Sequence, residues 1–202
     1  RSIYLRGDKT QAKAQQQLRI IGGQWRSRRL PFPAVPGLRP TGDRIRETLF
    51  NWLAAEIAGA RCLDLFAGSG ALCFEALSRG ASSCTAIERH PAAVQQLNDN
   101  KALLEADNLS IVGADCQQYL QQHRPQQGYH IVFIDPPFDH QLHSAVCAAV
   151  NSADWLAPGA TIYCELPATD NSFVAPVNWQ HRQEKVTGGV KYCLYSYIEP
   201  SA

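Results

Sequence analysis

The chain has 202 residues, of which 45% are apolar and 18% are charged, so it can bury the core of one ordinary domain and is not expected to be disordered. No apolar run approaches the roughly 18 to 20 residues that a membrane-spanning helix needs. Seven cysteines are spread along the chain without a C-x-x-C pair, a pattern typical of buried free thiols in the cytoplasm rather than of disulfides or a metal site. We therefore expect a cytoplasmic protein that contacts no membrane and binds no metal.

The net charge is only +1, but the charges are distributed unevenly. Residues 1–46 hold eleven basic and two acidic residues, a balance of +9, whereas residues 47–202 hold eight basic and sixteen acidic residues, a balance of −8. Nine of the eleven basic residues are arginines, which bind phosphate oxygens in a bidentate manner. This polarity favours a nucleic-acid partner for the first part of the chain, with a merely solvated charged tail as the alternative.

Two short strands and a linker are predicted at the N-terminal end. Residues 1–17 are polar and glutamine-rich, and we expect a flexible or marginally helical extension there. Apolar residues in 18–21 and 24–30 flank two glycines, which predicts a hairpin with a tight glycine turn. Four prolines between positions 31 and 40 then favour an extended linker.

The main domain, residues 41–202, is predicted to follow a basic extension of residues 1–40. Apolar residues recur at helical spacing after Thr41, which predicts a helix that starts near this residue. The later strands and helices are predicted, in pairs, at residues 61–66 and 70–79, 84–88 and 91–104, 109–112 and 116–123, and 130–134 and 140–151, with another strand at 161–165. This alternation predicts a doubly wound α/β fold with a mainly parallel sheet. Strands at 179–186 and 190–198 predict an antiparallel C-terminal hairpin that completes a seven-stranded sheet.

A glycine-rich loop links the first strand of the main domain to its helix. Its residues are Asp64, Leu65, Phe66, Ala67, Gly68, Ser69 and Gly70. The glycines let the backbone approach a ligand, and the N-terminus of the helix attracts a carboxylate or a phosphate. A dinucleotide-binding loop would need a third glycine where Cys73 stands, and the carboxylate of Asp64 suits an ammonium group. S-adenosylmethionine carries both an ammonium and a carboxylate, so we expect the loop to bind it; a simple tight turn is the alternative.

Two further acidic residues follow the next two strands. Glu88 ends the second strand, where a carboxylate accepts hydrogen bonds from ribose hydroxyls. Asp115 follows the third strand, where it would accept from an adenine amino group; taken alone it is better explained as a helix N-cap, and the two roles are compatible. With their neighbours Arg89 and Cys116, these residues complete the expected cofactor site.

The sharpest motif is Asp135-Pro136-Pro137-Phe138, directly after the apolar strand 131–134. Two prolines fix the backbone and remove two N–H donors, which leaves rigid carbonyl acceptors. The carboxylate of Asp135, which also borders the cofactor, and a proline carbonyl can bind both hydrogens of one NH₂ group while Phe138 stacks on the base. Such hydrogen bonds localise the nitrogen lone pair for attack on a sulfonium methyl. The motif predicts methyl transfer to an exocyclic amine of a base; a Pro-Pro loop without chemistry is the alternative.

With these residues in place, the chain from Leu18 onward resembles the bacterial RsmD family of class I methyltransferases, which N2-methylates a guanine of 16S ribosomal RNA. The most specific matches lie in residues 19–23, 39–53, 64–70 and 135–138. The resemblance implies that S-adenosylmethionine is the cofactor and that guanine 966 of 16S rRNA, naked or within the small ribosomal subunit, is the target. Gly42 departs from the family pattern, which usually has a threonine there, and this puts the capping of the following helix in question.

The resemblance also implies that the basic hairpin engages RNA. Arginine side chains would bind phosphates, and an indole ring would stack on a base. The residues expected to contact RNA are Arg19, Trp25, Arg26, Arg28, Arg29, Arg39, Arg44 and Arg46.

Three other functions remain open at this point. An adenine-N6 methyltransferase acting on DNA or RNA would use the same tetrapeptide, because adenine also presents an NH₂ group, although the chain has no added target-recognition domain of useful size. A non-enzymatic RNA-binding module would not need an intact set of Asp64, Glu88 and Asp135. A nicotinamide oxidoreductase is disfavoured by Cys73. Because a lone domain must release a large RNA product, we expect a monomer.

Overall fold

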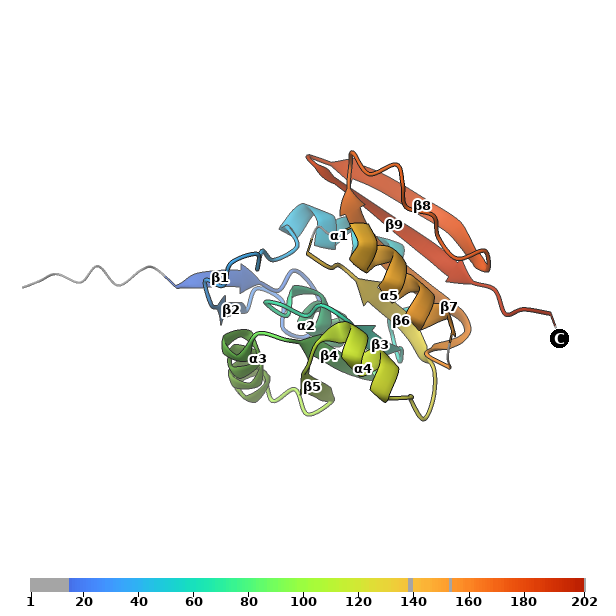
Figure 1. The fold of residues 1–202 in the computed structure, drawn as a ribbon. Helices are drawn as coiled ribbons and strands as arrows, with labels where there is room; N and C mark the ends of the chain where they lie inside the picture. The colour runs from blue at the N-terminus through green and yellow to red at the C-terminus, as the bar shows by residue number, and fades with distance from the viewer. Residues whose placement is uncertain (1–14, 138–139, 153, 202) are drawn as a thin grey trace, which may run out of the picture.

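The computed structural model describes residues 15–137, 140–152 and 154–201 (Figure 1). In chain order the elements are β1 (Gln16–Arg19), β2 (Arg29–Phe32), α1 (Asp43–Trp52), β3 (Arg61–Asp64), α2 (Ala71–Ser78), β4 (Ser83–Glu88), α3 (Pro91–Leu104), β5 (Leu109–Gly113), α4 (Cys116–Gln122), β6 (Tyr129–Ile134), α5 (His140–Ser152), β7 (Leu156–Pro167), β8 (Trp179–Thr187) and β9 (Val190–Tyr197). β1 and β2 form a small antiparallel sheet, and the other strands form one large sheet.

The large sheet has the strand order β5-β4-β3-β6-β7-β9-β8. The strands from β5 to β7 are parallel to one another, whereas β9 pairs antiparallel with both β7 and β8. The predicted doubly wound sheet with an antiparallel C-terminal hairpin is therefore confirmed. The chain runs outward from β3 to β5 and then crosses back to β6, so β3 and β6 flank the point where ligands bind in such sheets.

Helices cover both faces of the sheet because side chains of a strand alternate between the faces. In β6, Ile131 and Phe133 join the core under α1, α2 and α3, whereas Val132 and Ile134 join the core under α4 and α5. Figure 1 shows α4 and α5 in front of the sheet. All seven cysteines are buried in these two cores and none is paired. Within the described ranges, no helix combines the length and the apolar character needed to cross a bilayer.

The N-terminal hairpin differs from the prediction. Its second strand is β2, which includes Pro31 of the predicted linker, and not 24–30. Residues 20–28 make a wide turn that rests on the end of α2 instead of a tight glycine turn. Gly23 has a φ of +77°, and a Cβ atom there would lie 1.9 Å from the carbonyl oxygen of Ser78. The contact with α2, which no local pattern reveals, sets the length of this turn.

The hairpin shares the core of the main domain. Its apolar side chains Leu18, Ile20, Leu30 and Phe32 are at most 5% exposed and pack in the core under α1, α2 and α3. The extension is thus attached to the main domain by buried apolar surface as well as by the chain. Residues 36–42 then lead from the hairpin to α1 along the edge of the large sheet.

β7 is longer than the predicted strand 161–165, because it begins at Leu156. Pro158 and Gly159 interrupt the strand pattern in the sequence, and the pairing of β7 with β6 shifts register between Tyr129 and Ile131. An irregularity of this kind accommodates residues that disfavour regular pairing. β7 therefore continues through a segment that resembles a loop in the sequence.

Candidate active site

One cavity of about 720 Å³ lies at the carboxyl ends of the parallel strands. Its walls include the loop after β3, Glu88 at the end of β4, Asp115 after β5 and Asp135 after β6. Residues 36–42 form a further wall. The predicted cofactor site and the predicted amine site therefore share one cavity, as methyl transfer between them requires.

The glycine loop is held by its backbone conformation and by the side chain of Glu88. Gly70 is the N-cap of α2 with a φ of +84°, and a Cβ atom there would lie 2.5 Å from the ring of Phe74, so a larger residue would be strained. The N–H of Gly68 donates to Oε2 of Glu88 at 2.8 Å. These contacts hold the loop against the end of β4 and leave the N-terminus of α2 beside the cavity.

Asp64 supplies a carboxylate at the base of this loop. It is 1% exposed, and its Oδ2 has no hydrogen-bond partner among the described residues. Burial, partly offset by the backbone N–H of Phe66 and reinforced by the charge of Glu88, raises the pKa of Asp64 to about 7. A buried acceptor without a donor is costly. Because Asp64 also lines the cavity, a ligand ammonium fits this position, as the amino-acid end of S-adenosylmethionine requires.

Glu88 and Asp115 have local structural partners as well as access to the cavity. Oε1 of Glu88 accepts from the N–H of His90 at 2.8 Å, yet each carboxylate oxygen has a second lone pair for a ribose hydroxyl. Asp115 accepts from the N–H of Gln118 at 3.1 Å and caps α4. Its predicted cap is therefore confirmed, and its place in the cavity wall is compatible with the second role. Arg89 and Cys116 also line the cavity.

The predicted amine-binding motif follows β6, and Glu88 ends β4. These two strands flank β3 in the sheet. Asp135, Pro136 and Pro137 all line the cavity directly after β6. Phe138 lies outside the described residues, so its stacking role stays a prediction. The rigid Pro-Pro corner is thus next to the glycine loop, because β6 and β3 are neighbours in the sheet.

The carboxyl group of Asp135 has two further neighbours. The hydroxyl of Thr41 donates to Oδ2 of Asp135 at 3.2 Å. Burial and the nearby carboxyl groups of Glu165 and Asp64 raise the pKa of Asp135 well above its usual range. The pKa of Glu165 is also raised, mainly by burial. The amine-binding carboxyl therefore belongs to a cluster of acids.

Two parts of the cavity were missed in the sequence. Glu165 was predicted only as the end of a strand, although an acidic residue in that position reaches the same edge as Asp135. Residues 36–40 were predicted as linker, with Arg39 as an RNA contact, and Thr41 as the start of a helix, but none of them as a wall of the cavity. Glu165 could have been found from the rule that the carboxyl ends of parallel strands meet at one edge of the sheet. The path of the linker over the cavity has no local signal in the sequence.

The residues predicted to contact RNA fall into three groups. Trp25 is half-buried and packs against the core, so only part of its ring is available for stacking. Most of the arginines are exposed: Arg19, Arg26, Arg28, Arg29, Arg39 and Arg44. Of these, Arg39 also lines the cavity. Exposed guanidinium groups therefore lie both on the wide turn of the hairpin and at the entrance to the site.

Arg46 corrects the sequence interpretation. It is only 1% exposed and forms ion pairs with Glu75 at 3.2 Å and with Asp43 at 2.6 Å. Its guanidinium also donates to the carbonyl oxygens of Arg19 and Thr41, each at 2.9 Å. A fully engaged, buried guanidinium is not accessible to a phosphate. Arg46 instead fastens the end of the linker and the hairpin to α2.

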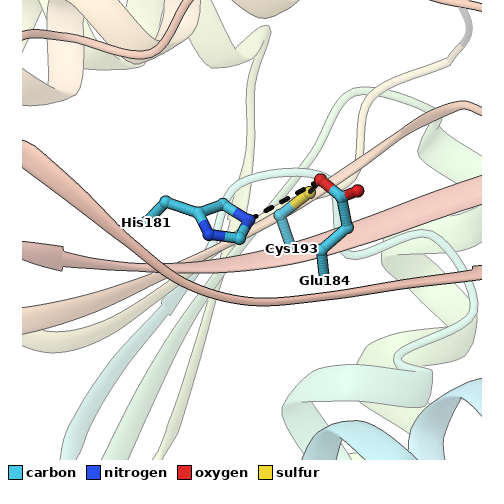
Figure 2. A group of neighbouring side chains, drawn as sticks. All are labelled: His181, Glu184 and Cys193. Atoms are coloured by element: carbon cyan, nitrogen blue, oxygen red, sulfur yellow. Dashed lines mark hydrogen bonds and ion pairs between the residues drawn. The ribbon is translucent and has the colours of Figure 1, made fainter.

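A separate group of donors lies on the C-terminal hairpin. In Figure 2, His181 and Cys193 both contact the carboxylate of Glu184, and the distance to its Oε2 is 3.6 Å from His181 Nε2 and from Cys193 Sγ. Nitrogen, oxygen and sulfur at such spacing are a set that zinc can bind. These atoms already pair with one another, however, and none of the three residues lines the cavity.

The doubly wound sheet with its antiparallel end, together with a cavity joining a glycine loop to acidic strand ends, defines a class I methyltransferase, a class that uses S-adenosylmethionine. The chain belongs to the family described as Conserved hypothetical protein 95, whose model matches residues 18–196. The resemblance to the RsmD family is thereby confirmed.

Curated relatives cover nearly the whole chain. Ribosomal RNA small subunit methyltransferase D of Escherichia coli (strain K12) is 50% identical over 179 residues, which cover 89% of each chain. The protein of the same name from Haemophilus influenzae is 42% identical over 184 residues, which cover 90% of this chain and 95% of that one. A solved Escherichia coli structure, described as that of a methyltransferase, yhhF, has a TM-score of 0.83 at 48% identity and covers 92% of this chain and 100% of that one.

Proposed function

We propose that this protein transfers a methyl group from S-adenosylmethionine to the exocyclic N2 amine of one guanine in 16S rRNA. The observation that carries the proposal is the single cavity in which the glycine loop and Asp135-Pro136-Pro137 meet. The relatives named ribosomal RNA small subunit methyltransferase D support the substrate class. The guanine and its N2 atom follow from the resemblance to the RsmD family.

Four features of the chain are proposed to bind the cofactor. Asp64, with its unpartnered Oδ2, would pair with the ammonium group, and the N-terminus of α2 would face the carboxylate. Glu88 would accept hydrogen bonds from the ribose, and Asp115 from the adenine amino group. When bound, S-adenosylmethionine supplies an electrophilic methyl group on a sulfonium.

The Pro-Pro corner is proposed to prepare the target nitrogen. A base amine is a weak nucleophile, because its lone pair is delocalised into the ring. Asp135 and a carbonyl of the corner would accept both N–H hydrogens and favour a tetrahedral nitrogen, which is stabilisation specific to the transition state. The chain's remaining task is to align nitrogen, methyl carbon and sulfur, for which no protein nucleophile is needed.

The hairpin turn is proposed to bind the RNA backbone. Arg26 and Arg28 of the turn and Arg29 at the start of β2 are exposed, and Arg39, farther along the chain, lines the cavity. Phosphates held by these side chains would direct a guanine toward Asp135. We further propose that a monomer acts in the cytoplasm, on naked 16S rRNA or on the small ribosomal subunit.

Mass mapping of nucleosides tests this function. Small-subunit RNA from cells lacking the protein should lack N2-methylguanosine at one position, and the purified protein with S-adenosylmethionine should restore it. Naked 16S rRNA and assembled small subunits are offered in parallel to identify the substrate. Methyl label recovered as N6-methyladenosine, or no label in either RNA, would refute the guanine assignment.

The Asp135→Ala variant tests the role of the cavity. It should lose methyl transfer while calorimetry still detects binding of S-adenosylmethionine, because the main role proposed for Asp135 is to hold the amine. Turnover equal to that of the wild type would exclude the amine-binding role.

A further inference from the structure

The end of β7 places a second carboxyl group beside Asp135. β6 and β7 are parallel and pair Ile134 with Cys164, so the next residues, Asp135 and Glu165, emerge side by side at the cavity. Glu165 is 7% exposed and lines the cavity. Burial raises the pKa of Asp135, and the two carboxyl groups lie close enough for the charge of Glu165 to raise it further. A hydrogen bond between them would require one shared proton.

Each carboxyl group of this pair is oriented by a hydroxyl group. Tyr163, which is fully buried, donates to Oε2 of Glu165 at 2.8 Å, and Thr41 donates to Oδ2 of Asp135 at 3.2 Å. These donors come from β7 itself and from the linker, two independent elements. Hydrogen bonds from the surrounding fold therefore hold both carboxyl groups in place.

The surroundings favour one negative charge on the pair. Two carboxylates in contact in a buried site do not both ionise near neutral pH, and burial, followed by Glu165 and Asp64, raises the pKa of Asp135. Besides Asp64 from β3, the titratable groups that face the pair within the described part of the chain are Tyr163, Tyr192 opposite Glu165 on β9, and His143 of α5. Nε2 of His143 lies 2.6 Å from the backbone oxygen of Glu165.

A single shared proton creates a requirement for the chemistry. Asp135 can accept a hydrogen bond from the target amine only with an unprotonated oxygen. If Asp135 kept the proton, it would become a donor at the position where an acceptor is needed. In the free protein, hydrogen bonding to Tyr163 and Asp135 partly offsets the burial that raises the pKa of Glu165 and favours the proton on Asp135, so the arriving amine must displace it. Glu165 is the neighbour that can take this proton without leaving a second charge in the cavity.

We propose that Glu165 is a positioning residue that holds the shared proton while Asp135 binds the amine, and that the pair then takes up the proton released by the methylated nitrogen. This inference rests on the proposed function, and assigns a role to a residue that its sequence motif does not include.

The proposed step transfers one methyl group and one proton. The nitrogen lone pair forms the new N–CH₃ bond, and the CH₃–S bond breaks with its electrons left on sulfur as a neutral thioether. The nitrogen loses one N–H proton to Asp135, so the pair now carries two protons and no charge. The positive sulfonium and the negative pair thus disappear together, which favours the reaction in a cavity where opposite charges interact strongly. The extra proton later passes to water.

The Glu165→Leu and Glu165→Gln variants test this role, because the glutamine amide donates a hydrogen bond to Asp135 as a protonated Glu165 would, whereas leucine donates none. We expect kcat for methylation of 16S rRNA to fall about 100-fold in Glu165→Leu, where Asp135 keeps its proton, and to stay near the wild-type value in Glu165→Gln, with the dissociation constant for S-adenosylmethionine unchanged in both. The pH profile of kcat should show two coupled ionisations in the wild type and one in Glu165→Gln. Glu184→Gln, on β8 and outside the cavity, is the matched control and should match the wild type.

The outcomes separate the inference from the function on which it rests. Wild-type kcat in Glu165→Leu, or an unchanged two-step profile in Glu165→Gln, would overturn the inference alone. An equal loss of kcat in Glu165→Leu and Glu165→Gln would mean a structural role, and would also overturn it. If the wild type does not methylate guanine, the proposed function fails instead. Infrared difference spectra of the RNA-free protein test the shared proton independently: a protonated carboxyl band at neutral pH, additional to that of Asp64, should be lost in Glu165→Gln.

Discussion

The buried carboxylate of Asp64 has one oxygen without a protein partner, and this has a consequence for cofactor binding. Its pKa is raised to about 7 by burial, so the group is largely protonated below neutral pH. An ammonium ligand interacts favourably only with the ionised form. Binding of such a ligand must therefore release a proton in acid solution.

The affinity for S-adenosylmethionine should accordingly rise with pH. Between pH 5.5 and 7.5 the dissociation constant should fall about 25-fold, as expected for a single acid with a pKa of about 7. Calorimetry across this range checks the slope. In the Asp64→Asn variant the affinity should be lower and nearly independent of pH; a variant that retained the wild-type slope would assign the titration to another group.

The sequence predicts the position of Glu165 at the edge of the sheet but not its contact with Asp135. Its position at the end of a predicted strand placed it at the correct edge of the sheet. Its contact with Asp135 depends on β7 being the neighbour of β6 and on a register that pairs Ile134 with Cys164. Neither follows from the alternation of strands and helices, so the individual carboxylates were predictable and their pairing was not.

Among the elements, α1 is fixed to the rest of the molecule by its buried arginine. Arg46 contacts Glu75 of α2 and the backbone of the hairpin and the linker. The helix has no side-chain cap, because its N-cap is Gly42. The orientation of α1 and of the adjoining linker thus depends on Arg46 more than on the helix terminus.

Replacing Arg46 should therefore destabilise the protein. We expect Arg46→Ala to lower the free energy of unfolding by about 3 kcal/mol, at the lower end of the range for a broken buried ion pair, because Arg79 remains paired with Glu75. Urea denaturation measures the change. Arg44→Ala, at an exposed position of the same helix, should stay within about 0.5 kcal/mol of the wild type. Equal effects of the two substitutions would contradict the network.

The wide turn between β1 and β2 is the element proposed to bind RNA. The triple variant Arg26→Ala, Arg28→Ala, Arg29→Ala should bind 16S rRNA more weakly, and its log–log salt dependence should be shallower by about 2 to 3, because about 0.7 to 0.9 counterions are released per phosphate contact. Filter binding at several salt concentrations gives the slope. Arg124→Ala with Lys185→Ala, two exposed basic residues elsewhere, is the control. A loss of cofactor affinity in place of RNA affinity would refute the assignment.

The elements differ in how well the sequence predicts them. The strand–helix pairs from β3 to β6 were recognisable because apolar runs and helical spacing reflect burial on one or both sides of each element. The prediction of a tight glycine turn was wrong because the shape of residues 20–28 is imposed by α2, more than fifty residues away in the chain. The early part of β7 was missed because Pro158 and Gly159 hide it.

At the scale of the whole molecule, the basic extension and the main domain are joined by a common core. Four side chains of the hairpin (Leu18, Ile20, Leu30 and Phe32) are buried there. At about 1.5 to 3 kcal/mol each, they contribute on the order of 6 to 12 kcal/mol, comparable to the net stability of a typical domain.

Deletion of residues 1–40 should therefore prevent independent folding of residues 41–202. Thermal unfolding followed by circular dichroism should lose its cooperative transition. A chain lacking only residues 1–14 is the control, because the described core contacts do not involve them, and it should unfold cooperatively. A cooperative transition of residues 41–202 near the full-length melting temperature would instead establish two separable domains.

The even distribution of the cysteines through the fold has a practical consequence. Each sits in a different element: Cys62 in β3, Cys73 in α2, Cys84 in β4, Cys116 in α4, Cys147 in α5, Cys164 in β7 and Cys193 in β9. Burial raises the pKa of Cys62 to about 12 and that of Cys193 to about 11, and all seven thiols are buried, so alkylating reagents have no access to them in the closed state. Each thiol becomes reactive only when its own element opens. Peptide mapping after timed alkylation would thus rank seven elements by their local opening, without the introduction of any cysteine by mutation.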